Sequence, residues 1–240
     1  MTAPILEARG LTMRFGGVVA VDNVDFILGD RELRCLIGPN GAGKSTFFKC
    51  LTGQYRPTAG RITYKGQDIT GRRLHEIARL GIGIKTQITN VFNGLTVYEN
   101  LWLALREPIG RAAVKARVEA VIERVGIAAL AHRTVAHLAH GERQLVELAL
   151  VLAGDPHLIL LDEPAAGMTH LEAERTAGII REINRTHALI VVEHDMQFVK
   201  QIADRVTVFH QGAILVEDKM ENILRNALVR DVYLGKRVAA

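Results

Sequence analysis

Short runs of mostly apolar residues recur along the chain, bounded by glycine, proline or charged residues. The clearest runs cover residues 33–37, 158–161, 189–192 and 206–209. Runs of this length are shorter than the helices of a globular core, and they are typical of strands that are buried on both faces of a parallel sheet. The pattern therefore predicts an α/β fold built on a mostly parallel sheet.

Other parts of the chain follow two further patterns. Residues 5–28 and 61–69 alternate between apolar and polar positions and are punctuated by turns, which predicts a small antiparallel β subdomain. Between residues 93 and 153 no strand pattern occurs, and apolar residues recur at helical spacing. We therefore predict a helical subdomain at about 93–153, inserted within a single domain that spans residues 1–240. The apolar positions that show the helical spacing are Val114, Val118, Val121, Ile122 and Val125.

The composition fits a folded domain of this size. Hydrophobic residues form 48% and charged residues 23% of the 240 residues, which are ordinary values for a globular protein with a substantial core. The net charge of +4 is small, and the basic residues Arg72, Arg73 and Arg79 have no Phe, Tyr or Trp between them. We interpret this basic run as a solvated face and expect no nucleic acid partner.

The sequence shows no signal for secretion or membrane insertion. Charged residues interrupt any apolar run at the start, and no stretch approaches the roughly 18 apolar residues that a membrane span requires. The two cysteines, Cys35 and Cys50, lie in apolar surroundings without metal-ligand spacing, as is usual in a reducing compartment. We expect a cytoplasmic protein, so another chain must supply the membrane part if it works at a membrane.

A glycine-rich segment at residues 38–46, here called the phosphate loop, matches the pattern G-x-x-x-x-G-K-[ST]. It follows a predicted strand and precedes a short helix that ends at Gly53. Glycines let backbone N–H groups approach phosphate oxygens closely, and the helix N-terminus adds positive potential. We expect Lys44 to bind the β- and γ-phosphates, and Ser45, the only serine in the chain, to hold Mg²⁺. The predicted ATP-binding residues of the loop are Asn40, Gly41, Ala42, Gly43, Lys44, Ser45 and Thr46.

Two adjacent acids follow the apolar run at residues 158–161. Asp162 and Glu163 therefore lie at the carboxyl end of a predicted strand, where ligands bind in open α/β sheets. We expect Asp162 to bind Mg²⁺, directly or through water, as the Walker B acid of P-loop NTPases does. Glu163 is then free to polarise the attacking water. Together with the phosphate loop, these acids predict a nucleotide hydrolase.

With three further motifs, the chain resembles the nucleotide-binding subunit of an ABC transporter over essentially its whole length. Gln87 matches the glutamine loop of that family, and His194 matches its switch histidine. Residues 138–142, Leu-Ala-His-Gly-Glu, occupy the position of the family signature Leu-Ser-Gly-Gly-Gln and are here called the signature segment. Stretches at 95–101, 162–168, 192–196 and 232–235 resemble the branch that serves uptake of branched-chain amino acids and of urea or amides. The resemblance implies the ABC ATPase fold and ATP hydrolysis coupled to transport.

The resemblance also implies roles for individual residues. Phe15 stands where the family places an aromatic ring against adenine. Gln87 is expected to sense the γ-phosphate and to help hold Mg²⁺, and His194 is expected to contact the γ-phosphate. Gln87, Glu163 and His194 thus form the implied catalytic group. The other implied nucleotide-binding residues are Val21, Ala139, His140, Gly141 and Glu142.

The signature segment departs from the usual family sequence at three positions, Ala139, His140 and Glu142. Ala139 lacks the serine hydroxyl that bonds the γ-phosphate across the family's dimer, and His140 replaces the first glycine. The backbone N–H of Gly141 and the helix after it can still supply positive potential. We therefore do not interpret these changes as the loss of the site.

Several partners are implied by the same resemblance. The chain has one phosphate loop and one signature segment, and the family pairs each loop with the signature of the opposite subunit. A head-to-tail dimer with the same or a related chain is expected at the cytoplasmic face of the inner membrane, with integral-membrane permease subunits and a substrate-binding protein. A soluble ABC ATPase, such as an iron–sulfur assembly factor, is the alternative. Import and export, and the cargo itself, are not distinguished by these residues.

Overall fold

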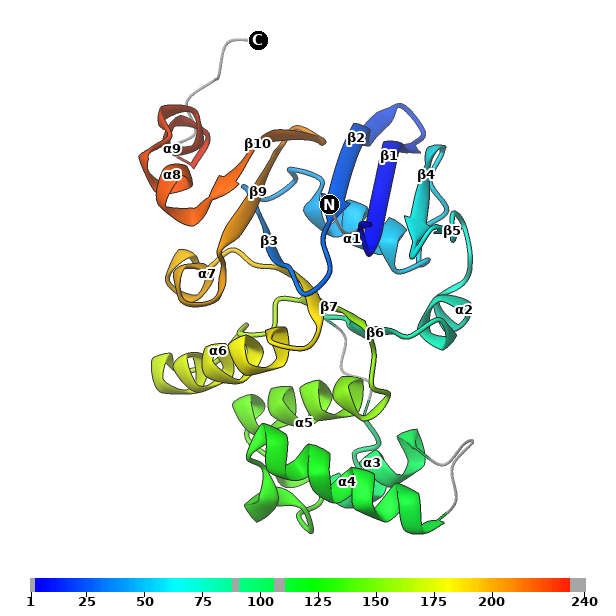
Figure 1. Ribbon diagram of the computed structural model, residues 1–240. Helices are drawn as coiled ribbons and strands as arrows, with labels where there is room; N and C mark the ends of the chain where they lie inside the picture. Colours follow the sequence, from blue (N-terminus) through cyan, green and yellow to red (C-terminus); the bar gives the residue numbers. More distant parts are fainter. Residues whose placement is uncertain (1–2, 88–90, 106–110, 234–240) are drawn as a thin grey trace.

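Two β-sheets organise the part of the chain that this computed structural model describes, residues 3–87, 91–105 and 111–233 (Figure 1). The larger sheet contains β3 (Leu33–Ile37), β6 (Ile82–Lys85), β7 (Leu158–Asp162), β8 (Ala188–Val192), β9 (Arg205–His210) and β10 (Ala213–Lys219). Its strand order is β10-β9-β3-β8-β7-β6, and every pair is parallel except β9 and β10. The predicted α/β fold with a mostly parallel sheet is confirmed.

The apolar runs coincide with the central strands of this sheet. Every residue of β3, β7 and β8 is buried, because helices cover both faces of the sheet. The strands at the two edges carry no such run. β6 contains Gly83 and ends in Lys85, and β10 is only half buried, so that neither has the apolar signal of a central strand.

The smaller sheet is antiparallel, as the alternation at residues 5–28 and 61–69 predicts. It consists of β1 (Leu6–Phe15), β2 (Val18–Leu28), β4 (Ala59–Tyr64) and β5 (Gln67–Asp68). These strands follow the order β2-β1-β4-β5, and each neighbouring pair runs antiparallel. The sheet lies on one side of the larger sheet, with a helix between them (Figure 1).

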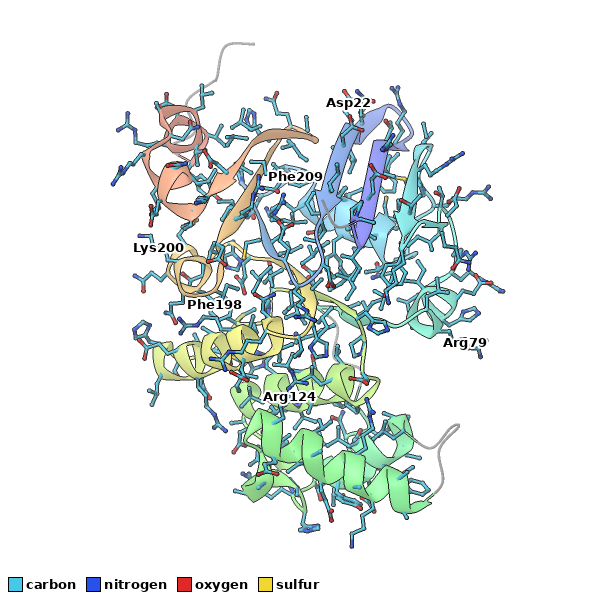
Figure 2. All side chains as sticks on the ribbon, viewed as in Figure 1. Asp22, Arg79, Arg124, Phe198, Lys200 and Phe209 are labelled. Atoms are coloured by element: carbon cyan, nitrogen blue, oxygen red, sulfur yellow. The ribbon has the colours of Figure 1, made fainter. Side chains whose placement is uncertain are left out.

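That intervening helix is α1 (Lys44–Leu51), which follows the phosphate loop. Phe47 is fully buried, and its ring centroid lies 5.5 Å from that of Phe26 on β2 and 5.2 Å from that of Phe209 on β9. Figure 2 labels Phe209 in this interior, whereas the charged side chains of Arg79 and Lys200 lie at the periphery. Helix α1 therefore joins the two sheets through one aromatic contact chain.

Helices and the turns that connect them form the described chain between residues 97 and 153, at the end of the molecule away from the smaller sheet (Figure 1). The helices are α3 (Val97–Ala104), α4 (Arg111–Val125) and α5 (His140–Ala153), with short 3₁₀ helices at Ala128–Leu130 and Val135–His137. The five apolar residues with helical spacing all lie on α4 and are buried in one core with α5. The limits 93–153 of an inserted subdomain stay a prediction.

The remaining helices complete the cover of the larger sheet. α6 (His170–Asn184) and α7 (Met196–Ile202) pack on the face opposite α1, where Phe198 and Ile180 meet apolar residues of the central strands. The other helices are α2 (Leu74–Arg79), α8 (Met220–Arg225) and α9 (Ala227–Tyr233). None of the described helices combines the length and the hydropathy that crossing a bilayer requires.

Both cysteines are buried in the core. Burial raises the pKa of the Cys50 thiol to about 11. Burial also raises the pKa of the Cys35 thiol, and the nearby negative charge of Glu193 raises it further. Each side chain is therefore a neutral, unreactive thiol near neutral pH.

The aromatic contact of α1 with both sheets gives a stability prediction. Phe47→Ala should lower the free energy of unfolding by about 3–5 kcal/mol, because a cavity remains between the two sheets. Phe92→Ala is the matched control, since the Phe92 side chain is 63% exposed. Chemical denaturation of both variants measures the difference, and equal losses of stability would contradict the role given to α1.

Candidate active site

The phosphate loop is confined by close contact with two neighbouring strands. Gly38 and Gly43 have φ angles of 145° and 101°, which side chains rarely allow. A Cβ atom on Gly38 would lie 2.2 Å from the carbonyl oxygen of Phe209, and one on Gly43 would lie 2.4 Å from that of Ala20. Only glycine fits at these positions, so the loop is held tightly against β9 and β2.

Lys44 begins α1 and folds back over the loop that precedes it. Its Nζ donates hydrogen bonds to the carbonyl oxygens of Gly38, at 2.7 Å, and Pro39, at 3.0 Å. Burial lowers the pKa of Lys44, and the nearby carboxylates of Glu163 and Asp162 partly oppose this change. The ammonium group is thus held where the loop and the start of α1 would receive phosphate.

Asp162 ends β7 and lies beneath the loop. Burial and the adjacent Glu163 raise the pKa of Asp162, while the positive charges of Lys49, Lys85 and Lys44 lower it. A carboxylate that is held at the carboxyl end of a central strand, close to a phosphate loop, is well placed to bind a metal–nucleotide complex.

Glu163 brings the predicted catalytic residues together. Its backbone is in the left-handed region, with φ at 47°, and its N–H donates to the Val192 carbonyl at 2.9 Å. Gln87 Nε2 donates to Glu163 Oε2 at 3.2 Å, and His194 Nδ1 lies 3.4 Å from Glu163 Oε1. These three side chains follow β6, β7 and β8, whose carboxyl ends meet at one edge of the sheet.

Glu193 is a neighbouring residue that the sequence patterns do not single out. Its side chain is 1% exposed, and its carboxylate accepts hydrogen bonds from the backbone N–H groups of Ala165, His194 and Asp195, at 3.1, 3.1 and 3.4 Å. Burial raises its pKa, and these hydrogen bonds partly oppose the change. Glu193 ties the loop after Glu163 to the start of α7. The only sequence signal is an acid at the end of an apolar run.

A pocket of about 400 Å³ opens above the phosphate loop. Phe15, the residue predicted to contact adenine, lines this pocket and is 43% exposed. Val21 is fully buried in the core between the sheets, and Ala20, whose side chain points the other way along β2, lines the pocket instead. The lining residues are Phe15, Ala20, Asn40, Gly41, Ala42, Gly43, Lys44, Ser45, Thr46, Glu163 and His194.

The signature segment lies apart from this pocket, at the N-terminus of α5. The Glu142 carboxylate accepts the backbone N–H of Ala139 at 2.9 Å and Nη1 of Arg133 at 2.9 Å, so it caps its own helix. His140 Nε2 lies 2.8 Å from the carbonyl oxygen of Ala166, which requires a proton on Nε2. None of residues 139–142 is among those that line the pocket.

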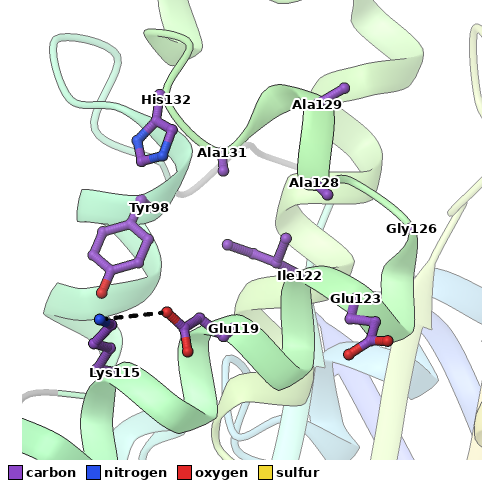
Figure 3. A pocket seen from close by; sticks show the side chains of 10 residues that line it. All are labelled: Tyr98, Lys115, Glu119, Ile122, Glu123, Gly126, Ala128, Ala129, Ala131 and His132. Atoms are coloured by element: carbon purple, nitrogen blue, oxygen red, sulfur yellow. Dashed lines mark ion pairs between the residues drawn. The ribbon is translucent and has the colours of Figure 1, made fainter.

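A larger pocket, of about 850 Å³, lies among the helices between α3 and α4 (Figure 3). Tyr98 and His132 stack at one side with centroids 6.1 Å apart, and Lys115 pairs with Glu119 at 3.9 Å. This pocket has neither a phosphate loop nor the acids at the strand ends. Its size alone therefore does not make it the reactive site, since the predicted phosphate-binding residues line the smaller pocket instead.

The predicted metal ligands offer oxygen atoms, which suit Mg²⁺. They are the hydroxyl of Ser45, the carboxylate of Asp162 and the amide oxygen of Gln87, and Mg²⁺ usually takes few protein ligands beside water and phosphate. Within the described ranges, no group of three or more His, Cys, Asp or Glu side chains could hold an ion by itself. The residues present thus fit an ion that arrives with a nucleotide.

The chain is similar to known proteins over almost its whole length. The family described as "ABC transporter" matches residues 21–166. The chain is 38% identical to the high-affinity branched-chain amino acid transport ATP-binding protein LivG of Salmonella typhimurium, over 98% of this chain and 100% of LivG. It is 36% identical to BraF of Pseudomonas aeruginosa, which has the same description, with the same coverage. The ADP conformation of MJ1267, an ATP-binding cassette of an ABC transporter, has a TM-score of 0.88 at 26% identity and covers 98% of this chain and 100% of its own.

The position of the Lys44 ammonium gives a binding prediction. Lys44→Ala should weaken ATP binding by about 10- to 100-fold, because a charge-assisted contact worth about 1.5–3 kcal/mol is lost. Lys200→Ala, at an exposed position of α7, is the control. Titration with a fluorescent ATP analogue measures both affinities. An unchanged affinity for Lys44→Ala would place the phosphates elsewhere.

Proposed function

The chain belongs to the ABC transporter family, and on this basis we propose that it hydrolyses ATP to drive the transport of branched-chain amino acids. The likeness to LivG covers almost the whole chain and is not limited to the phosphate loop. This observation supports branched-chain amino acids as the cargo. Urea and small amides belong to the same proposed class of small polar solutes. The geometry around Glu163 supports the hydrolytic part of the proposal.

ATP binding begins at the phosphate loop. The nucleotide base would lie against Phe15, and the phosphates would replace the two backbone carbonyls that now bind the Lys44 ammonium. Backbone N–H groups of the loop and of the first turn of α1 point at the same place. A bound Mg²⁺, held by Ser45 and Asp162, would neutralise phosphate charge.

Hydrolysis then depends on the groups around Glu163. Its carboxylate can accept the proton of a water whose oxygen attacks the γ-phosphorus, as a general base does. Gln87, which follows β6, and His194, which follows β8, contact the two carboxylate oxygens from either side of β7 and so fix their direction. His194 also lines the pocket above the phosphate loop, where it could contact the γ-phosphate.

Replacement of the general base tests this assignment. Glu163→Gln should lower kcat for ATP hydrolysis by about 10²- to 10⁴-fold and leave ATP affinity nearly unchanged, because an amide cannot accept the proton. Phosphate release and nucleotide titration measure the two effects. Glu221→Gln, an exposed position on α8, is the matched control, and chelation of Mg²⁺ should stop hydrolysis by the natural protein. Unchanged turnover in Glu163→Gln would remove Glu163 from the reaction.

The separation of the two nucleotide-binding groups within one chain supports a dimer. The phosphate loop lines the pocket, whereas the signature segment contributes nothing to it. We therefore propose that the signature of a second subunit, the same chain or a related one, closes the pocket from outside. The amide groups at the N-terminus of α5 would then face the phosphates.

An apolar hollow on α3 supports contact with a permease subunit. It has a volume of about 410 Å³ and is lined by residues of α3 and by Leu95, shortly before that helix. Leu103, one of its lining residues, is 37% exposed, and an apolar hollow with exposed apolar side chains is typical of a surface that binds a partner. We propose that a permease helix fills this hollow at the cytoplasmic membrane face and that a substrate-binding protein completes the transporter. The lining residues are Leu95, Tyr98, Glu99, Trp102 and Leu103.

Recovery of the complex tests the partners. The tagged chain, isolated from detergent-solubilised membranes of its own cells, should bring down polytopic permease subunits that mass spectrometry identifies, and a second ATPase subunit if the dimer is mixed. Leu103→Asp should lose the permease, while Leu224→Asp, on an exposed face of α8, should keep it. An active ATPase that is recovered without any membrane protein would favour a soluble ABC ATPase, of the iron–sulfur assembly type, instead.

A further inference from the structure

A lysine and a glutamate are buried together between the edge strand β6 and helix α5. Lys85 is 4% exposed, Glu147 is 6% exposed, and Lys85 Nζ lies 3.4 Å from Glu147 Oε2. Lys85 is the last residue of β6 and comes two positions before Gln87. Glu147 lies on the helix whose first turn carries the signature segment. The pair thus connects two segments to which separate roles in hydrolysis are proposed.

The contact of helix and strand has a defined register. A Cβ atom on Gly83 would lie 2.6 Å from Val151 Cγ1, so α5 rests directly on the backbone of β6 at this point. Gly83 and Lys85 share one face of the strand, and Glu147 and Val151 share one face of the helix. The contact of Gly83 with Val151 and the contact of Lys85 with Glu147 therefore match the two-residue repeat of the strand and the four-residue spacing of the helix. Together they set where α5 lies along β6.

Stability alone is a weak reason for a buried ion pair here. The pair is almost completely buried, and apolar side chains of similar volume can stabilise such a position equally well or better. In addition, Glu147 Oε1 has no hydrogen-bond partner, and a buried acceptor without a partner is a cost. An ion pair does, however, impose a distance and a direction that apolar contacts lack. The position of the two groups, rather than their energy, is therefore the property that needs explanation.

The same face of α5 also contacts the loop after Glu163. His140, Gln144 and Glu147 lie at spacings of four and three residues, which places them on one side of the helix. His140 Nε2 lies 2.8 Å from the Ala166 carbonyl, and Gln144 is 8% exposed between the two contacts. At one end, this polar face contacts the strand that leads to Gln87. At its other end, it contacts the loop that Glu163 begins.

We propose that Lys85 is a positioning residue for ATP hydrolysis, which acts through its ion pair with Glu147. The pair fixes the end of β6 against the signature helix and thereby sets Gln87 at its 3.2 Å contact with Glu163. This inference rests on the proposed function, because it requires Gln87 and Glu163 to act on ATP. A displacement of about 1 Å in such a group can cost about 100-fold in rate.

Three variants separate a positioning role from a structural one. Lys85→Met and Glu147→Gln each leave one buried polar partner alone, and Lys85→Met/Glu147→Leu replaces the pair by apolar groups of similar size. We measure kcat and KM for ATP and the midpoint of thermal unfolding for each full-length protein. The exposed pair Lys115→Met/Glu119→Leu on α4 is the matched control, for which no change in these quantities is expected.

The double variant decides the question even if a single variant fails to fold. We expect it to unfold near the natural midpoint, because no buried charge remains unpaired, and yet to have a kcat at least about tenfold lower with KM within about threefold of the natural value. A double variant with natural kcat would show that the pair is structural and would overturn the proposal. So would a rise in KM with kcat unchanged, which would place Lys85 in nucleotide binding. Natural protein without any ATPase activity would instead overturn the proposed function, and the positioning role with it.

Discussion

The carboxyl ends of the parallel strands meet at one edge of the larger sheet, and this constraint places nearly every reactive group. Strand β3 ends in the phosphate loop, β6 leads to Gln87, β7 ends in Asp162 and Glu163, and β8 leads to His194. The central strands are buried and mostly apolar, and the polar groups of the candidate site lie where the strands end. Residues that are far apart in the sequence thus become neighbours within hydrogen-bonding distance.

A second constraint is steric and acts on the loop itself. Gly38 and Gly43 contact backbone carbonyls of β9 and β2, from the two different sheets. The shape of the phosphate loop therefore depends on how these sheets are held relative to each other, and α1 holds them through Phe47. The short helix α1 therefore determines both the packing between the sheets and the geometry of the phosphate loop.

Local patterns allow the prediction of the central strands, the phosphate loop and the acids of β7, because each of these features has its signal within a few consecutive residues. The family resemblance, which the comparisons confirm, adds Gln87 and His194, and these lie beside Glu163 in the structure. Edge strands β6 and β10 lack the apolar signal, because β6 is short and contains Gly83 and Lys85, and β10 is only half buried. The ion pair of Lys85 and Glu147 has no sequence signal at all, because each residue is an ordinary charged side chain until the fold buries both.

The N-terminus and the body of helix α1 have different roles, and this arrangement has a thermodynamic consequence. Its N-terminus is the proposed place of phosphate binding, while its body is buried between the two sheets. A ligand that binds only when this helix is formed raises the free energy of unfolding. The increase is about 4 kcal/mol when the ligand concentration is a thousand times its Kd. The protein would therefore resist heat and proteolysis more strongly when cellular ATP is abundant. Its lifetime in the cell would then follow the energy supply on which its work depends.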